Sequence, residues 1–338
     1  MDGRREIHEK VLEMKKIIAL IPFILLFCES MSHPGIGIVK DSKGNIFYTD
    51  LKHIWKLSPD GTKTIAVQNV HSHEIYLDKD DNLFGEHLWY EGEATDKWGH
   101  YVWCLRNDGK LEKIINNKEG FLSNYSFVRD DAGNMYWVER FKTSRFMKKT
   151  PDGRVSKFAE GKFKNIRWMI STKEGILYFI DAGESLYRID QNGKISEIAS
   201  DLGEVSSVFT VIDQDHNAYC PWIDGDNNVY VPLLDSRKVK RVSPDGKVVT
   251  VLTTAQGWGP ASGLIDEKGN LWLLEYGGGF DARVRMIAKN DFGKETRGGR
   301  NVFFSLILPF ALISGFLLAI VILLIRLYRF LSRKMVRA

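Results

Sequence analysis

One short pattern recurs six times between residues 36 and 275, and it constrains the fold more than any other feature of the chain. Each copy has a short apolar stretch, a polar turn close to Asp-x-x-Gly-Asn and a second apolar, aromatic stretch. The copies cover residues 36–50, 74–86, 127–139, 168–181, 222–231 and 263–275. Glycine and asparagine supply the left-handed conformations that a tight turn needs, so each copy predicts a β-hairpin.

A further strand and a second turn follow each hairpin. These second turns include S-P-D-G-T at Ser58 and S-P-D-G-K at Ser243, where proline presets the turn and glycine closes it. Successive first turns lie 37 to 52 residues apart, which is the period of a four-stranded propeller blade. The sequence therefore predicts an all-β protein, a six-bladed β-propeller over residues 33–293. The sixth blade stops after three strands, so a swapped strand that closes the ring is hard to find.

The two ends of the chain are apolar in different ways. Residues 17–27 follow Met14-Lys15-Lys16 and are too short to span a bilayer, so residues 1–32 are expected to be an N-terminal extension and signal peptide. A lipoprotein cysteine at Cys28 is disfavoured because Phe27 before it is large. Residues 302–325 carry no charge and would form a helix about 36 Å long, enough to cross a membrane.

The charges around this apolar run predict its orientation. Five basic residues follow within 326–338, so this tail is expected in the cytoplasm, with 294–301 as a linker. The prediction is a single-pass membrane protein whose propeller lies on the extracytoplasmic (periplasmic or extracellular) side. The net charge of +4 comes mostly from the ends, which argues against nucleic-acid binding. Outside the signal region only Cys104 and Cys220 remain, so disulfides are not expected to hold the fold.

The alternation of strands sorts the loops between two faces. The glycine-rich turns share one face, here called the turn face, and the longer, varied loops share the other, here called the mouth. The predicted ligand-binding residues lie at the mouth: His71, His73, Glu74, Trp89, Asn124, Asn165, Arg167 and Trp258. Arginine and histidine favour an anionic or hydroxylated ligand, and the tryptophans, in glycine-rich loops, could stack on a sugar or a peptide aromatic ring.

The repeat resembles NHL repeats and SMP-30/gluconolactonase-like propellers, in the cadence D-x-x-G-N-[IL]-[FYW] followed by S-P-D-G. In the lactonases of that family the resemblance implies a divalent ion in the channel, held by carboxylates and asparagines. Asn165 and Asn124 match the asparagine positions, but Gly35 and Tyr219 stand where carboxylates are expected. We therefore predict no metal ligands and no cofactor from this resemblance. A second metal idea is that His71, His73, His87 and His100 converge.

Three functions follow from these observations. The preferred one is a membrane-anchored propeller that binds a small-molecule, glycan or protein ligand at the mouth, with no catalytic residue assigned. The alternative is a metal-dependent hydrolase of lactonase or esterase type, which the missing carboxylates disfavour. The third is a structural subunit whose partner docks on the outer edges of the blades.

Overall fold

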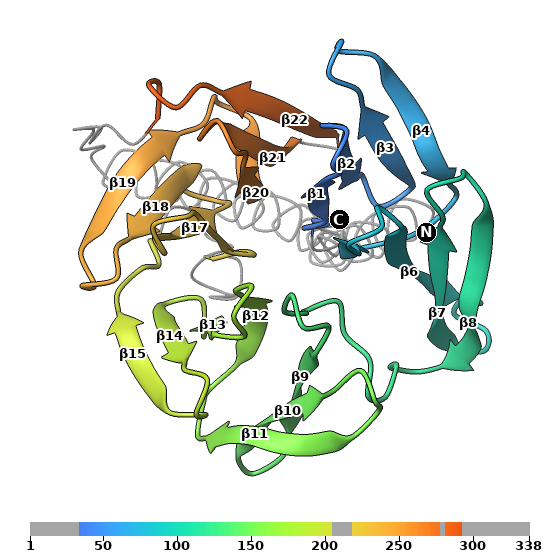
Figure 1. The fold of residues 1–338 in the computed structure, drawn as a ribbon, viewed down its shortest axis with the longest axis horizontal. Helices are drawn as coiled ribbons and strands as arrows, with labels where there is room; N and C mark the ends of the chain where they lie inside the picture. The colour runs from blue at the N-terminus through green and yellow to red at the C-terminus, as the bar shows by residue number, and fades with distance from the viewer. Residues whose placement is uncertain (1–33, 205–217, 278–280, 293–338) are drawn as a thin grey trace, which may run out of the picture. The chain divides into compact units, whose positions relative to one another are not determined.

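The described residues form a ring of six antiparallel sheets around a central axis (Figure 1). This computed structural model describes residues 34–204, 218–277 and 281–292. The predicted six-bladed propeller is confirmed. The predicted signal peptide (1–32), linker (294–301), membrane helix (302–325) and basic tail (326–338) lie outside the described residues. Within the described ranges, no helix is long and apolar enough to cross a membrane.

Each blade is a meander whose first strand lies nearest the axis. Blade one contains β1 (Ile38–Lys40), β2 (Ile46–Thr49), β3 (His53–Leu57) and β4 (Lys63–Gln68). Blade two contains β5 (Ile75–Leu77), β6 (Leu83–Tyr90), β7 (Trp98–Leu105) and β8 (Leu111–Glu119). Blade three contains β9 (Met135–Arg140), β10 (Ser144–Lys149) and β11 (Val155–Gly161).

The other half of the ring follows the same plan. Blade four contains β12 (Ile166–Ser171), β13 (Leu177–Asp181), β14 (Ser185–Ile189) and β15 (Ile195–Ala199). Blade five contains β16 (Trp222–Ile223), β17 (Val229–Leu233), β18 (Lys238–Val242) and β19 (Val248–Thr253). Blade six contains β20 (Trp258–Ile265), β21 (Leu271–Gly277) and β22 (Ala282–Ile287).

A pair of hydrogen bonds between an aspartate and the asparagine four residues later stabilises the recurring turn. Asp130 accepts the backbone N–H of Asn134 at 2.8 Å with one carboxylate oxygen and its side-chain amide at 2.7 Å with the other. The residue before the asparagine, here Gly133, has a φ of 77°. The same pair occurs at Asp41–Asn45, Asp78–Asn82, Asp224–Asn228 and Asp266–Asn270. The aspartate thus satisfies the backbone donor that the turn would otherwise leave unpaired.

Two blades among the described residues have three strands. In blade three the inner strand expected before the first turn is reduced to a single bridge between Arg129 and Met135. Blade six ends with β22, as the repeat predicted, and the chain then lies on the turn face, where the Lys289 N–H donates to Asn270 Oδ1 at 3.2 Å.

Blades one and six close the ring by side-chain packing. Ile38, Ile46 and Tyr48 of blade one share a buried cluster with Leu274 and Tyr276 of blade six. The Tyr276 hydroxyl donates to the Thr49 carbonyl at 2.8 Å. Among the described residues no sheet contains strands from both ends of the ring. In the part of the chain that the structure describes, this seam therefore depends on an apolar interface, the buried hydrogen bond of Tyr276 and an ion pair between Lys40 and Glu267.

The structure corrects one local prediction. Trp89, Trp98 and Trp258 were expected in glycine-rich loops, but they lie in β6, β7 and β20. Trp89 is paired across the sheet with Gly99, where a Cβ atom would lie 2.5 Å from the indole ring. Glycine makes room here for a large neighbouring ring, so it marks a strand rather than a loop.

Candidate functional site

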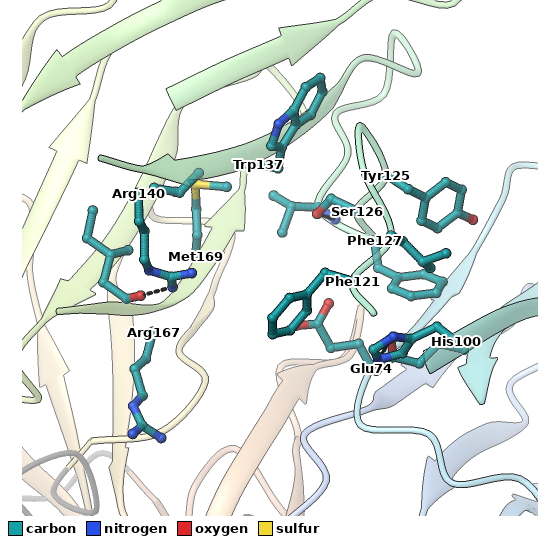
Figure 2. A pocket seen from close by; sticks show the side chains of 15 residues that line it. Glu74, His100, Phe121, Tyr125, Ser126, Phe127, Trp137, Arg140, Arg167 and Met169 are labelled. Carbon is teal, nitrogen blue, oxygen red and sulfur yellow. Dashed lines mark hydrogen bonds and ion pairs between the residues drawn. The ribbon is translucent and has the colours of Figure 1, made fainter. Parts of the chain in front are cut away.

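A cavity of about 300 Å³ opens at the mouth among blades two, three and four (Figure 2). We call it the mouth cavity. Its lining residues include the carboxylates Glu74 and Glu86, the arginines Arg140 and Arg167 and the imidazole of His100, and its aromatic residues are Phe121, Tyr125, Phe127 and Trp137. An apolar wall with a few converging polar groups is typical of small-molecule sites.

Glu74 stands where the mouth cavity meets the axial channel. It also lines a second cavity of about 940 Å³ that follows the inner strands of the ring and includes Cys220 and Ser262. Its half-buried carboxylate makes no hydrogen bond or ion pair within the described part of the chain. Burial first, and then the nearby Glu86 carboxylate, raise the pKa of Glu74 to about 7. Near neutral pH this group can therefore gain or release a proton.

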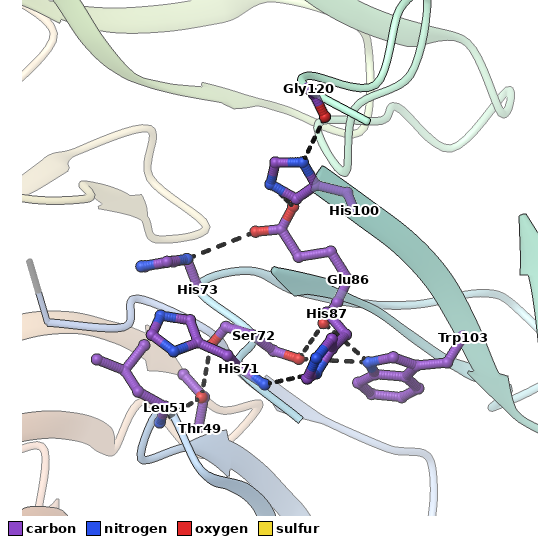
Figure 3. Close-up of polar contacts among 10 residues, drawn as sticks. All are labelled: Thr49, Leu51, His71, Ser72, His73, Glu86, His87, His100, Trp103 and Gly120. Atoms are coloured by element: carbon purple, nitrogen blue, oxygen red, sulfur yellow. Dashed lines mark hydrogen bonds and ion pairs between the residues drawn. The ribbon is translucent and has the colours of Figure 1, made fainter. Parts of the chain in front are cut away.

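Two histidines flank Glu86 (Figure 3). Glu86 Oε1 lies 3.7 Å from His73 Nδ1, and Oε2 lies 3.7 Å from His100 Nε2. His100 Nδ1 lies 3.0 Å from the Gly120 carbonyl oxygen, so this nitrogen carries a proton that it donates. The other ring nitrogen of His100, Nε2, is the one that faces Glu86.

His71 and His87 contact each other and form no ion pair with Glu86 among the described residues. The His71 backbone N–H donates to His87 Nδ1 at 3.0 Å, and the His87 ring stacks on Tyr101. Burial, followed by the neighbouring His73 and His87, lowers the pKa of His71 to about 4, so the ring is neutral at pH 7. The four rings do not converge on one point. In residues 34–204, 218–277 and 281–292 no group of three or more His, Cys, Asp or Glu side chains is arranged to hold a metal ion.

Side-chain donors hold the backbone segments that carry the two glutamates. The indole Nε1–H of Trp103 donates to the Glu86 carbonyl at 2.9 Å, and the Ser72 hydroxyl donates to the same carbonyl. The Ser72 carbonyl in turn accepts from the Thr49 hydroxyl at 2.6 Å. The loop that carries His73 and Glu74 is thereby tied to both β2 and β6.

A β-bulge presents Arg167 to the mouth cavity. The register of β12 against β13 shifts between Ile166 and Trp168, which leaves Arg167 as the extra residue. Bulges re-aim a side chain in this way. The neighbouring Arg140 ends β9 and donates to the Ile166 carbonyl, and burial followed by the charge of Arg167 lowers the pKa of Arg140. Two guanidinium groups therefore lie close together on one wall.

The structure brings some of the predicted binding residues together. Glu74 and Arg167 line the mouth cavity, His73 contacts Glu86 beside it, and the His71 ring lies 4.8 Å from the His73 ring. Sequence reasoning left Glu86, His100, Arg140 and the aromatic residues out of this set. Glu86 and Arg140 both lie toward the mouth end of a blade's second strand, a shared position that would have pointed to them.

The other predicted binding residues lie outside the mouth cavity. Trp89 packs on Gly99, and Trp258 lies under Arg283, whose Cζ is 3.8 Å from the ring centre. Asn124 is exposed in a left-handed conformation with a φ of 56°. Asn165 donates its backbone N–H to Asp181 at 2.7 Å.

The two positions that correspond to lactonase carboxylates are filled by packing. A Cβ atom on Gly35 would lie 2.4 Å from Thr49 Cγ2 and 2.8 Å from the Tyr276 hydroxyl, so a carboxylate side chain has no room there. Tyr219 is fully buried and stacks on Trp168. These residues do not fit a divalent ion held as the resemblance implies.

Comparison with known proteins supports the fold. A putative gluconolactonase is 15% identical, with 75% of this chain and 89% of that chain covered and a TM-score of 0.50. The propeller shares the gluconolactonase-like fold. The resemblance predicted from the repeats is therefore confirmed at the level of architecture. No family model and no curated protein matches the sequence.

Two other solved structures are similar at a lower level. A gluconolactonase from Xanthomonas campestris is 10% identical, with 75% of this chain and 87% of that chain covered and a TM-score of 0.49. A streptogramin B lyase is 13% identical, with 72% and 91% covered and a TM-score of 0.48. Folds shared at such identities do not carry chemistry with them.

Proposed function

We propose that this protein is a membrane-anchored, extracytoplasmic propeller that binds a small ligand in the mouth cavity. The observation that carries the proposal is the composition of that cavity. A carboxylate without a hydrogen-bond partner among the described residues, two arginines and four aromatic rings line one concave surface. Structural packing alone gives no reason for such groups to gather around an open space.

Phe121 supplies a second argument. Its side chain is 78% exposed although it lines the cavity, and its ring stacks near His100 and edge-on to Trp98. An exposed aromatic ring at the rim of a pocket can cover a bound ligand and lose contact with water when it does so.

The membrane anchor rests on the ends of the chain. The charge-free run 302–325 and the basic tail 326–338 support it, and the apolar residues 17–27 support export of the propeller. A protease-protection assay on intact cells tests this part separately from ligand binding.

Screening the purified full chain against small amphipathic compounds by saturation-transfer NMR tests the binding site. We expect Phe121→Ala and Arg167→Ala each to weaken binding of the hits about tenfold, because each removes one wall contact of roughly 1.4 kcal/mol. The matched controls are Phe141→Ala, exposed but outside the cavity, and Lys247→Ala on the turn face. If binding of the hits is unchanged in Phe121→Ala and Arg167→Ala, or falls by the same amount in the two controls, the mouth cavity is not the site.

A hydrolase remains the second candidate because of one observation. Glu74 has a pKa of about 7 in a cavity that also holds Arg167, which suits a general acid or base beside a cation that could stabilise an oxyanion. Gluconolactonases share the fold, which makes lactones and esters the substrates to assay. This candidate requires turnover that Glu74→Gln abolishes. A metal-dependent version further requires stoichiometric metal in the purified chain.

A further inference from the structure

The inner edge of β9 in blade three is open toward the mouth. The Tyr136 N–H donates inward to the Val128 carbonyl at 3.0 Å, and alternation along a strand gives Val138 and Arg140 the same inward direction. The Val128 N–H, however, donates to the Ser126 hydroxyl, so the inner ladder stops there. The backbone N–H and C=O groups of Val138 and Arg140 thus have no hydrogen-bond partner within the described part of the chain.

The other five blades fill this position. In each of them an inner segment reaches the mouth end of the second strand. The backbone pairs there are Thr49 with Gly37 in blade one, Leu88 with His71 in blade two, Asp181 with Ile166 in blade four, Pro232 with Tyr219 in blade five and Gly277 with Trp258 in blade six. In blade three, residues 121–126 do not pair with β9, so its mouth half has no described inner neighbour.

The mouth cavity lies along this open edge. Trp137 and Val138 both line it, although consecutive side chains of a strand point to opposite faces. A cavity that meets both faces of β9 lies at an edge of the strand, and β10 covers the other edge. In Figure 2 the side chains of Ser126 and Phe127 lie across the cavity from Arg140. A space with aromatic walls therefore adjoins backbone groups that are able to pair.

We propose that the mouth cavity binds a short extended peptide that adds the missing inner strand to blade three, antiparallel to β9, and directs a basic side chain toward Glu74. This rests on the proposed function, because it names the ligand class of the same cavity. Pairing at an exposed sheet edge is a recurring mode of peptide recognition, in which main-chain hydrogen bonds give affinity and pockets for alternate side chains give specificity. A peptide fits this edge because it repeats N–H and C=O groups at the same spacing as β9.

The register determines which wall each peptide side chain meets. Three peptide residues cover the open edge, with the outer two opposite Arg140 and Val138 and the middle one opposite Glu139. The Arg140 side chain reaches the Ile166 carbonyl of blade four, so the Glu139 side chain lies on the other face, toward blade two. Directly opposite residues share a face, so the middle side chain of the peptide also points toward blade two.

Charge complementarity favours a basic residue at this middle position. The carboxylates on that side are Glu139 and the two glutamates of blade two, Glu74 and Glu86. Glu74 makes no hydrogen bond or ion pair within the described ranges, so a cation there would favour its ionised form. The two arginines of the cavity are engaged within the protein, Arg140 with the Ile166 carbonyl and Arg167 by an interaction of its own, so neither is assigned to the ligand.

Blocked tripeptides test the pairing on the purified full chain at pH 8, where Glu74 is ionised. The probe is acetyl-Val-Lys-Val-amide, which has no terminal charges. N-methylation of both valines removes the two N–H groups that would face β9, whereas N-methylation of the lysine removes only the N–H that faces away. We expect the first change to weaken binding at least about tenfold in titration calorimetry, and the second by less than about threefold. Because these comparisons use the unaltered protein, they do not depend on whether any variant folds.

Replacement of the lysine by norleucine tests the basic side chain separately. It keeps the length of the side chain and removes its charge, so we expect binding about tenfold weaker. In Glu74→Gln the lysine and norleucine peptides should bind within about threefold of each other. The control Glu119→Gln, at an exposed position of β8, should preserve the difference between them.

Val138→Pro tests the edge from the side of the protein. Proline removes the N–H that would face the peptide and leaves the pairing of the neighbouring residues with β10, as is usual in edge strands. We expect this variant to bind acetyl-Val-Lys-Val-amide at least about fivefold more weakly. Val138→Ala keeps the N–H and shortens the side chain, so it should weaken binding by less than about threefold.

The outcomes separate this proposal from the proposed function. Equal binding of the two methylated peptides, equal binding of the lysine and norleucine peptides, or no binding of any peptide at millimolar concentration would overturn the addition of a basic peptide strand. Hits from the wider screen that still depend on Phe121 would leave the proposed function standing.

Discussion

At the scale of single residues, two half-buried groups near the mouth oppose each other in their response to pH. Glu74 has a pKa of about 7 instead of 4.5, and His71 has a pKa of about 4 instead of 6.5. Between pH 4.5 and 7 the folded state therefore holds a proton at Glu74 that the unfolded state has lost, so stability falls as pH rises. Between pH 4 and 6.5 the unfolded state protonates the histidine while the folded state does not, so stability rises with pH.

These two effects should largely cancel in the unaltered protein. Each amounts to at most roughly 3 kcal/mol, because one pKa unit corresponds to 1.36 kcal/mol. Relative to the double variant Glu74→Gln/His71→Gln, Glu74→Gln alone should lose stability on acidification from pH 7 to 4.5, and His71→Gln alone should gain it. Urea unfolding at several pH values measures both. Two curves parallel to the double variant would mean that neither group titrates abnormally.

The sequence predicted those residues of the mouth cavity whose position in or next to a mouth loop was sufficient to identify them. Glu74, His73 and Arg167 follow directly from their place just before or at the start of an inner strand. Glu86 and Arg140 were not predicted, because they lie within the second strands β6 and β9 and only loop positions were considered. The bulge that presents Arg167 leaves no mark in the repeat pattern.

At the scale of elements, glycine has two roles that the sequence does not distinguish. In the turns it adopts a positive φ, as at Gly133, and this role was predicted. At Gly85 and Gly99, in β6 and β7, it makes room for tryptophan rings on the facing strand. Whether a glycine breaks a strand or accommodates a ring depends on its cross-strand partner, which local periodicity does not identify.

Gly85→Ala tests this second role. An added Cβ would lie 2.1 Å from Cζ2 of Trp103, a ring that is 2% exposed and held by its hydrogen bond to the Glu86 carbonyl. Because the ring has little room to move, we expect a loss of about 3 kcal/mol, at the upper end of the cost of overpacking. Urea unfolding followed by tryptophan fluorescence gives this value.

Gly225→Ala is the matched control. No atom lies within 4 Å of its added Cβ, and its φ is outside the left-handed region. It should change stability by less than about 1 kcal/mol, with a small gain from the stiffer unfolded chain. Equal losses in the two variants would contradict the packing role of Gly85.

At the scale of the whole molecule, the number of blades was predictable and the closure of the ring was not. Six copies of one hairpin determine the architecture because each must bury its faces against its neighbours. The sequence also placed the end of blade six after three strands. The hydrogen bond between Tyr276 and Thr49 joins residues 227 positions apart, and no local sequence pattern predicts it.

Tyr276→Phe tests the seam. Removal of the hydroxyl leaves the buried Thr49 carbonyl without this donor, so we expect a loss of about 1 to 3 kcal/mol. Tyr187→Phe is the control, because the Tyr187 hydroxyl donates to Glu197 at an exposed position and its loss should cost less than about 0.5 kcal/mol. Similar losses in both would show that the seam bond has no special weight.

The point where the described chain ends has a consequence for access. Lys289 lies beside Asn270 on the turn face, on the side of the ring opposite the mouth. The last described residues therefore stay on the turn face, where Phe292 packs against the cluster that contains Trp222, Tyr230 and Leu271, and they leave the mouth cavity uncovered.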